Sequence, residues 1–360
     1  MCNKSVNIIT IHNEPNYGAL LQAYALYHVI ETLGYTPRMI NLGMQFRKYP
    51  YNVPYRMLVA IHNWLKGYNH CYQIAQSFCQ RNEPNLLGDF QTAEQLRNYP
   101  WDENDIYLVG SDQVWNPFIT GNLQPAYTLS FLADKCINRY SYAASLGHIK
   151  DEARRAQKLD IQHTLRKFKE ITVREQFGVE FLQKNGIPAT EVVDPTLLVD
   201  SYEHLLPRKK EDIPQILYLA LGEDEPMNQF AQDVANKYHL PLRKVYGYLQ
   251  PSRTINKRFL PVEEWLYQIA CSRVIVTNSF HAMVFSVLFG RDFYVYISNP
   301  SKVFRIENLL KKLNLHQRIV SNIDQVHPNR HPAYDEITLK LAEYRKSSLN
   351  KLNDMLKENL

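Results

Sequence analysis

The feature that most constrains the fold is a regular alternation of short apolar runs with amphipathic segments. In the first half of the chain such runs occur at residues 6–11 and 106–109, and each ends in small and polar residues. The second half starts the same pattern again at residue 216. Short apolar runs bounded by turn residues predict buried strands, and strands that alternate with helices form parallel sheets. The sequence therefore predicts an α/β protein with two Rossmann-like domains that face a cleft.

The same pattern places the individual elements. Strands are expected at residues 6–11, 38–41, 106–109, 139–144, 170–174 and 191–193, and then at 216–221, 242–246, 274–277 and 292–297. Apolar side chains spaced three and four residues apart predict helices at 19–34, 151–168, 175–186, 226–238, 261–271, from 281, from 301 and at 334–357.

The turn Asp194-Pro195 is a reasonable boundary, because 360 residues exceed one ordinary core. We expect an N-terminal Rossmann-like domain at 1–194, a C-terminal one at 195–330 and an amphipathic helix at 331–360. Residues 46–97 break the pattern, since tyrosines and Trp64 alternate there with Arg, Lys and His. We interpret them as a helical insertion in the first domain. It either meets a sugar or a lipid head group or packs on the sheet as a cover.

Composition limits the cellular compartment and the classes of partner that we expect. The 41 Lys and Arg against 36 Asp and Glu give a net charge of +5, without a long basic run, so we expect no nucleic-acid partner. Five cysteines without a CxxC pair favour a reducing compartment. No apolar stretch is long enough for a membrane span and the N-terminus is no secretion signal. We expect a cytoplasmic protein.

Four loops share one design, in which an apolar strand ends in small and polar residues before a helix. They lie at residues 13–18, 110–116, 144–147 and 277–281. Such loops present backbone N–H groups and short polar side chains at the sheet edge, as anion and sugar sites require. The candidate substrate-binding residues in these loops are Asn16, Tyr17, Gly18, Ser111, Asp112, Gln113, Ser145, Asn278 and Ser279.

His281 is the candidate catalytic residue. At a helix N-terminus the macrodipole disfavours the imidazolium, so a free His281 is expected to act as a base. A bound multivalent anion opposes this and favours a proton donor. The alternative is a turn histidine that only bonds to the backbone. Lys302 and Arg305, on one helix face, and the strand-end Arg174 are candidate anion ligands, and Arg174 is equally suited to a structural ion pair.

Several familiar motifs are absent. The sequence has no GxGxxG, no GxxxxGK[ST], no GxSxG and no cluster with convincing metal-ligand spacing, so no metal is expected. Between Trp265 and Arg291 there is no acidic residue. Nucleotide-sugar glycosyltransferases with two Rossmann-like domains usually carry a glutamate there to hold ribose. Its absence favours a donor that is itself highly anionic.

A set of short motifs resembles the polysaccharide pyruvyl transferase family. In order they are NYGALLQAYAL at 16–26, GSDQVWN at 110–116, YAAS at 142–145, VRE at 173–175, DP at 194–195 and SFH at 279–281. The resemblance implies a glycosyltransferase-B-like fold and transfer of pyruvate from phosphoenolpyruvate to a sugar hydroxyl pair as a cyclic ketal, in cell-surface polysaccharide biosynthesis. It implies that His281 and Arg305 handle phosphoenolpyruvate, and that no cofactor is needed beyond this co-substrate.

The resemblance also implies partners. We expect a lipid-linked or nucleotide-linked sugar acceptor on the first domain, phosphoenolpyruvate on the second, and peripheral contact with the cytoplasmic membrane face. The chain departs from the family pattern at Asn278, Phe280 and Ala282. Two rival hypotheses remain, a nucleotide-sugar glycosyltransferase and a non-catalytic sugar-binding protein.

Overall fold

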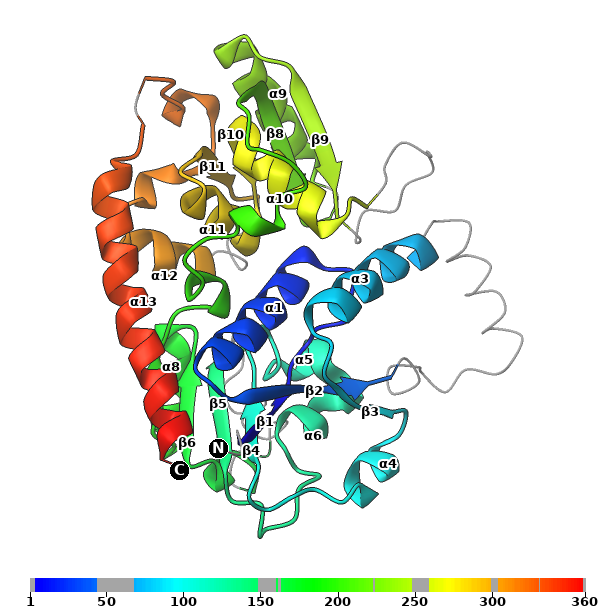
Figure 1. Ribbon diagram of the computed structural model, residues 1–360. Coiled ribbons are helices and arrows are strands. Elements are labelled where there is room, and N and C mark those ends of the chain that lie inside the picture. Colours follow the sequence, from blue (N-terminus) through cyan, green and yellow to red (C-terminus); the bar gives the residue numbers. More distant parts are fainter. Residues whose placement is uncertain are drawn as a thin grey trace.

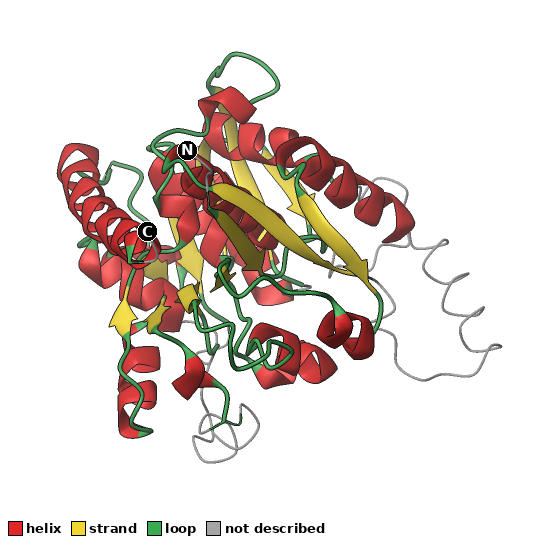
Figure 2. Ribbon diagram, turned by 60° about the horizontal axis from the view of Figure 1, so that its bottom comes forward, coloured by secondary structure: helices red, strands yellow, loops and turns green. Residues whose placement is uncertain are grey.

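In the computed structural model, two α/β halves, each with a parallel sheet, lie one above the other (Figure 1). The structure describes residues 4–43, 68–147, 160, 163–222, 224–247, 259–298, 304–329 and 331–358. The helix α13 (Tyr334–Lys357) runs along one flank of both halves. Strands lie inside and helices outside (Figure 2). Within the described residues, no helix combines the length and apolar character that a membrane-spanning segment requires.

The first half contains a seven-stranded parallel sheet in the order β3-β2-β1-β4-β5-β6-β7. Its strands are β1 (Ser5–Ile9), β2 (Thr36–Leu42), β3 (Leu86–Phe90), β4 (Ile106–Val109), β5 (Arg139–Ala144), β6 (Glu170–Val173) and β7 (Thr190–Glu191). The strand order reverses between the neighbours β1 and β4. Because ligands bind at such a switch point in open α/β sheets, the loops after β1 and β4 are well placed to contact one.

The second half contains a five-stranded parallel sheet in the order β12-β11-β10-β8-β9. Its strands are β8 (Ile213–Ala220), β9 (Leu242–Tyr246), β10 (Ser272–Thr277), β11 (Asp292–Tyr296) and β12 (Ile319–Val320). Here the switch point lies between β8 and β10. The loop after β10 leads directly to His281, so the strand order itself places this histidine at a ligand-binding edge.

Helices cover the sheets, and most of the longer ones lie where the apolar spacing predicts them. They are α1 (Tyr17–Thr32), α3 (Tyr68–Asn82), α4 (Ala93–Asn98), α5 (Pro117–Thr120), α6 (Gln124–Tyr127), α8 (Gln176–Lys184), α9 (Glu225–Tyr238), α10 (Val262–Cys271), α11 (Phe280–Leu288), α12 (Phe304–Lys312) and α13. Short 3-10 turns include η3 (Leu165–Lys167), η4 (Pro195–Leu197) and η5 (Glu203–Leu205). Most of the helix expected at 151–168 lies outside the described residues.

The prediction of a helical insertion at 46–97 is wrong for residues 68–97, the part of this range that the structure describes. Residues 46–67 lie outside the described residues, but α3 connects β2 to the parallel edge strand β3 and so belongs to the regular βα alternation. The strand β3 was missed because an edge strand needs no apolar run. Its residues Leu86, Gly88 and Asp89 face solvent or lie half-exposed, and only Phe90 is buried.

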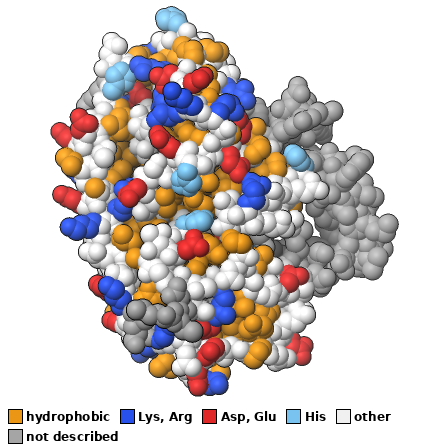
Figure 3. Space-filling model, in the orientation of Figure 1, with side chains coloured by type: hydrophobic (Ala, Val, Ile, Leu, Met, Phe, Trp, Pro, Cys, Tyr) orange, Lys and Arg blue, Asp and Glu red, His pale blue; other side chains and the backbone are white. Residues whose placement is uncertain are grey.

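The two halves share a hydrophobic core. Side chains of α1 and α3 pack in one cluster with those of α10, α11 and the second sheet. Tyr17 of α1 stacks between Phe259 and Trp265, with ring centroids 4.3 and 4.7 Å away. Residues at the start of α13 pack on the second half and those at its end on the first. On the face seen in Figure 3, basic side chains are interspersed with acidic ones.

Candidate active site

The carboxyl ends of β4, β5 and β6 meet at one edge of the first sheet. The loops after β4 and β5 are hydrogen-bonded to each other, since Ser145 N donates to the Asp112 carbonyl at 2.9 Å. Trp115 N donates to the Ser145 carbonyl at 3.2 Å. Arg174 follows β6 directly. The strand order therefore brings together Ser111, Asp112, Ser145 and Arg174, which lie far apart in the sequence.

His281 reaches this edge from the second half. It lies in the first turn of α11, where Ser279 Oγ caps the helix by accepting from Ala282 N at 3.4 Å. The His281 side chain is buried, and its Nε2 lies 3.7 Å from Asp194 Oδ2. Its other ring nitrogen faces the first turn of α1, because a Cβ added to Gly18 would lie 1.9 Å from Nδ1. The imidazole is thus held between Gly18 and Asp194.

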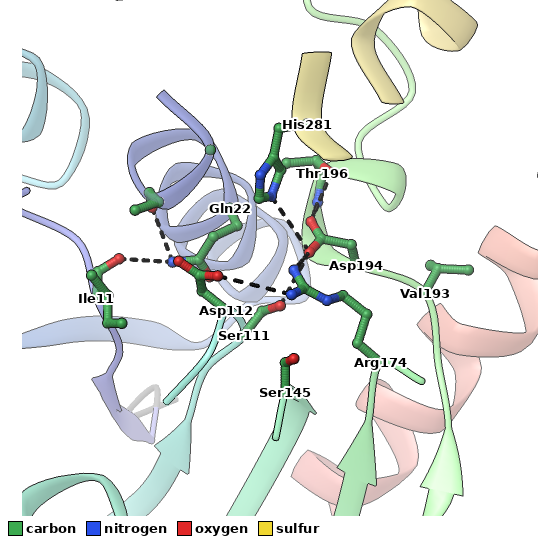
Figure 4. A network of polar contacts seen from close by, with 12 residues as sticks. Ile11, Gln22, Ser111, Asp112, Ser145, Arg174, Val193, Asp194, Thr196 and His281 are labelled. Carbon is green, nitrogen blue, oxygen red and sulfur yellow. Dashed lines mark hydrogen bonds and ion pairs between the residues drawn. The ribbon is translucent and has the colours of Figure 1, made fainter. Parts of the chain in front are cut away.

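Asp194 is the centre of a buried polar network (Figure 4). Its Oδ2 accepts from Arg174 Nη1 at 2.5 Å and from Ser111 Oγ at 3.2 Å, and its Oδ1 accepts from Thr196 Oγ1 at 2.7 Å. Burial alone raises the pKa of Asp194, but Arg174 and His281 more than offset it and hold that pKa well below its ordinary value. Asp194 is therefore an anion beside His281 at neutral pH.

Arg174 and Glu175 extend the network toward β5. Arg174 Nε donates to Glu175 Oε1 at 3.2 Å, and its Nη2 lies 3.8 Å from Asp112 Oδ1. Ser145 Oγ donates to the same Glu175 oxygen at 2.6 Å. Burial lowers the pKa of Arg174, but the neighbouring carboxylates outweigh it and raise that pKa above its ordinary value. Arg174 therefore stays cationic inside the protein.

A second guanidinium lies close to Arg174. Both Arg174 and Arg305, on α12, contact the ring of Phe280, at 4.9 and 5.9 Å from its centroid. Burial, and then repulsion from Arg174, lower the pKa of Arg305. Arg305 makes no ion pair with any residue that the structure describes. Both arginines line the same pocket, where a bound anion would offset the repulsion between them.

His281 stands between two pockets at the junction of the halves. One is lined by Arg174, Glu175, Asp194, Phe280, Arg305 and Lys312, among others. Lys312 is itself ion-paired with Glu191. The other is lined by Asn16, Tyr17, Gly18, Leu221, Trp265 and Ser279, among others. His281 itself lines neither pocket, but its chain neighbours do: Ser279 and Ala282 line the second pocket and Phe280 lines the first.

Other predicted site residues contact the protein itself. Asn16 caps α1, its side chain accepting from Gly18 N at 3.0 Å. The Tyr17 hydroxyl accepts from Leu260 N and donates to its carbonyl, and Asn278 Oδ1 accepts from Leu221 N at 2.7 Å. Gln113 Oε1 accepts from Asn116 Nδ2 at 2.7 Å. Lys302 lies outside the described residues. For these residues, as for all the predicted site residues, contact with substrate stays a prediction.

Sequence reasoning missed Asp194 and Glu175. The sequence predicts Asp194 in an interdomain turn and Glu175 at the start of a helix, with no role in the site for either. Both belong to the short motifs DP at 194–195 and VRE at 173–175, so the signal was present in the sequence. Its meaning depends on the contacts with Arg174, Ser145 and His281, which local patterns do not contain.

The sequence model of the polysaccharide pyruvyl transferase family matches residues 16–300, most of the chain. The protein belongs to this family. The family assignment made from the motifs is thereby confirmed, and it identifies a transferase. None of the curated proteins is significantly similar to the chain in sequence.

Solved structures confirm the glycosyltransferase-B-like fold. One is UDP-GlcNAc 2-epimerase of Methanocaldococcus jannaschii, with a TM-score of 0.52, 11% identity, and coverage of 98% of this chain and 99% of the other. Another is an O-GlcNAc transferase mutant of Thermobaculum terrenum, with a TM-score of 0.50, 9% identity, and coverage of 99% and 66%. At such low identity the likeness concerns the fold alone.

The contact between Gly18 and His281 gives a testable coupling. We expect Gly18→Ala to lower the free energy of unfolding by about 1–3 kcal/mol, because the new methyl group overlaps the imidazole. In a His281→Ala background the same substitution is expected to cost much less, since the overlapping ring is gone. Urea unfolding of the four variants of this cycle measures the difference. An equal cost in both backgrounds would contradict the contact.

Proposed function

We propose that this protein transfers pyruvate from phosphoenolpyruvate to a sugar hydroxyl pair as a cyclic ketal, in the biosynthesis of a cell-surface polysaccharide. Family membership supports a pyruvyl transferase. The observation that carries the proposal is the pair Arg174 and Arg305 beside His281, in a pocket between the two halves.

The pair suits a small, highly charged donor. Phosphoenolpyruvate carries a phosphate and a carboxylate, and guanidinium groups bind both in bidentate fashion. Nη2 of Arg174 is buried and makes no hydrogen bond within the described part of the chain, although Asp112 lies near it. A phosphate or carboxylate oxygen there would accept from Nη2 and offset the repulsion between Arg174 and Arg305.

In the proposed reaction, His281 donates a proton to the methylene carbon of phosphoenolpyruvate, which becomes a methyl group. A sugar hydroxyl adds to the adjacent carbon and returns its proton to His281. The C–O bond to phosphate then breaks, the second hydroxyl closes the ring on the same carbon, and its proton leaves with the phosphate. The anion Asp194 stabilises the protonated imidazole, and the two arginines stabilise the departing phosphate.

The proposal places the sugar acceptor near the loop after β1, whose residues Asn16, Tyr17 and Gly18 border the second, small pocket. We propose a lipid-linked or nucleotide-linked sugar as acceptor, used at the cytoplasmic membrane face. The scheme uses no redox cofactor.

The decisive experiment combines phosphoenolpyruvate with candidate lipid-linked and nucleotide-linked sugars. We expect sugar-dependent phosphate release and a carboxyethylidene group on the sugar by mass spectrometry. Arg305→Met is expected to raise the KM for phosphoenolpyruvate at least about tenfold through the lost charged hydrogen bonds. Lys311→Met, an exposed cation on the same helix, is the matched control and should change nothing.

Ligand protection against thermal unfolding separates the rival functions. Stabilisation by phosphoenolpyruvate supports the proposal. Stabilisation by UDP but not by phosphoenolpyruvate, with no phosphate release, would favour a nucleotide-sugar enzyme. Sugar binding without turnover of either donor would favour a non-catalytic binding protein.

A further inference from the structure

Three side chains of types that can bind metals meet between the end of β1 and the end of α3. His12 follows β1, Cys79 lies in the last turn of α3, and Glu83 comes just after that helix. One potential ligand atom from each lies within 4.8 Å of the other two. His12 Nδ1 is 3.2 Å from Glu83 Oε2, and Cys79 Sγ donates to the His12 carbonyl at 3.3 Å.

All three side chains are buried, with exposed fractions of 3% for His12, 4% for Cys79 and 0% for Glu83. A carboxylate removed from water requires a compensating cation and satisfied oxygens. Within the described part of the chain, Glu83 Oε1 and His12 Nε2 have no hydrogen-bond partner. A protonated His12 would supply one charge but would leave these atoms unsatisfied.

We propose that His12, Cys79 and Glu83 form a structural zinc site that ties α3 to the end of β1. Imidazole, thiolate and carboxylate are the ligand types that Zn²⁺ takes, and the thiolate favours zinc over magnesium or calcium. The thiolate and the carboxylate neutralise the charge of the ion. Zinc binding releases the Cys79 thiol proton to solvent.

The three side chains must close around the ion. Zn–N and Zn–O bonds of about 2.0 Å in a tetrahedron place two ligand atoms about 3.3 Å apart. The three potential ligand atoms lie within 4.8 Å of one another, so side-chain rotations would bring them to this spacing. Cys79 and Glu83 are four residues apart on one helical face, and Glu83 N donates to the Cys79 carbonyl at 2.7 Å, so the two keep a fixed relation. A fourth position is left for water.

This site is separate from the pockets beside His281, but the two are connected through the chain. His12 directly precedes the loop 13–18, whose last residue, Gly18, contacts His281. Zinc would therefore hold the base of the loop that positions the imidazole. Spacing in the sequence did not reveal the site, because His12 lies 67 residues before Cys79.

The test uses the full chain without a histidine tag. After removal of metal with a chelator, titration with Zn²⁺ is expected to restore one bound zinc per chain and to raise the Tm. Co²⁺ in its place should give a thiolate-to-cobalt absorption band. Cys79→Ser should weaken metal binding at least about tenfold and abolish the band. Cys71→Ser, on the same helix but outside the cluster, is the matched control.

Two outcomes would overturn the proposal. One is a wild-type chain that binds no zinc and shows no cobalt–thiolate band on reconstitution, which would leave a plain His12–Glu83 ion pair. The other is metal binding that is equal in Cys79→Ser and Cys71→Ser. The wild-type measurement needs no variant, so a Cys79→Ser chain that fails to fold does not prevent the test. Phosphate release plays no part in these readouts, so they are independent of the proposed function.

Discussion

His281→Asn is expected to slow sugar-dependent phosphate release from phosphoenolpyruvate by about 10²–10⁴-fold, because asparagine cannot transfer the proton that the methylene carbon requires. The buried ring lies between Gly18 and Asp194, so the smaller amide is expected to leave the fold intact. Single-turnover measurement of phosphate release gives the rate of the chemical step. Circular dichroism and the Tm report whether the fold is kept.

His239→Asn is the matched control for this substitution. His239 ends α9 in the left-handed conformation, with a φ of 54°, which asparagine adopts readily. It lies outside both pockets beside His281. We expect wild-type activity from this variant. Full activity of His281→Asn would instead remove His281 from proton transfer and leave the arginine pair as the main catalytic feature.

Asp194→Asn is expected to lower the free energy of unfolding by about 3–5 kcal/mol, the usual cost of leaving one partner of a buried ion pair unpaired. The variant keeps the size of the side chain but removes the charge that Arg174 contacts at 2.5 Å. Activity should fall as well, because the protonated His281 loses its neighbouring anion. Urea unfolding and phosphate release measure the two effects.

The control is Asp200→Asn, which removes an exposed carboxylate 2.7 Å from Arg345. Exposed pairs contribute little because solvent screens them, so this variant should keep nearly the stability of the wild type. Equal stabilities of Asp194→Asn and Asp200→Asn would show that the buried ion pair of Asp194 with Arg174 stabilises the fold no more than an exposed one.

The pH dependence of stability follows from the lowered pKa of Asp194. A carboxylate with a lowered pKa in the folded state stabilises the protein above its unfolded pKa of about 3.9. This stabilisation is lost as the pH falls from there through the lower folded pKa. The stability difference between wild type and Asp194→Asn is thus expected to be constant above about pH 5 and to shrink below about pH 4. A difference that disappears near neutral pH would contradict the lowered pKa.

Most of the fold could be predicted from local patterns. Buried parallel strands contain continuous apolar runs, such as the whole of β4 and Val274–Val276 of β10, because both faces of the sheet are covered. The edge strand β3 could not be predicted in this way, because most of its side chains face solvent and it has no continuous apolar run. For the same reason α3 was interpreted as part of an insertion rather than as the crossover helix between β2 and β3.

The candidate site was predicted in its parts but not in its contacts. The turn at Ser279 and His281 was identified from strand, cap and helix signals that lie next to each other in the chain. For Arg174, an anion ligand and a structural ion pair were left open. The structure shows the ion pair with Asp194 and also places Arg305 beside it, so the two alternatives do not exclude each other.

The sequence by itself determined most of the strands and helices, the polar loops that end the strands, and the motifs that mark the family. These follow from periodicity and from neighbouring residues. Only the tertiary structure decided that Gly18 holds the His281 ring, that Asp194 joins Arg174 to it, and that His12 lies beside Glu83. Contacts between such distant positions depend on strand order and on the packing of the two halves, and no local spacing contains that information.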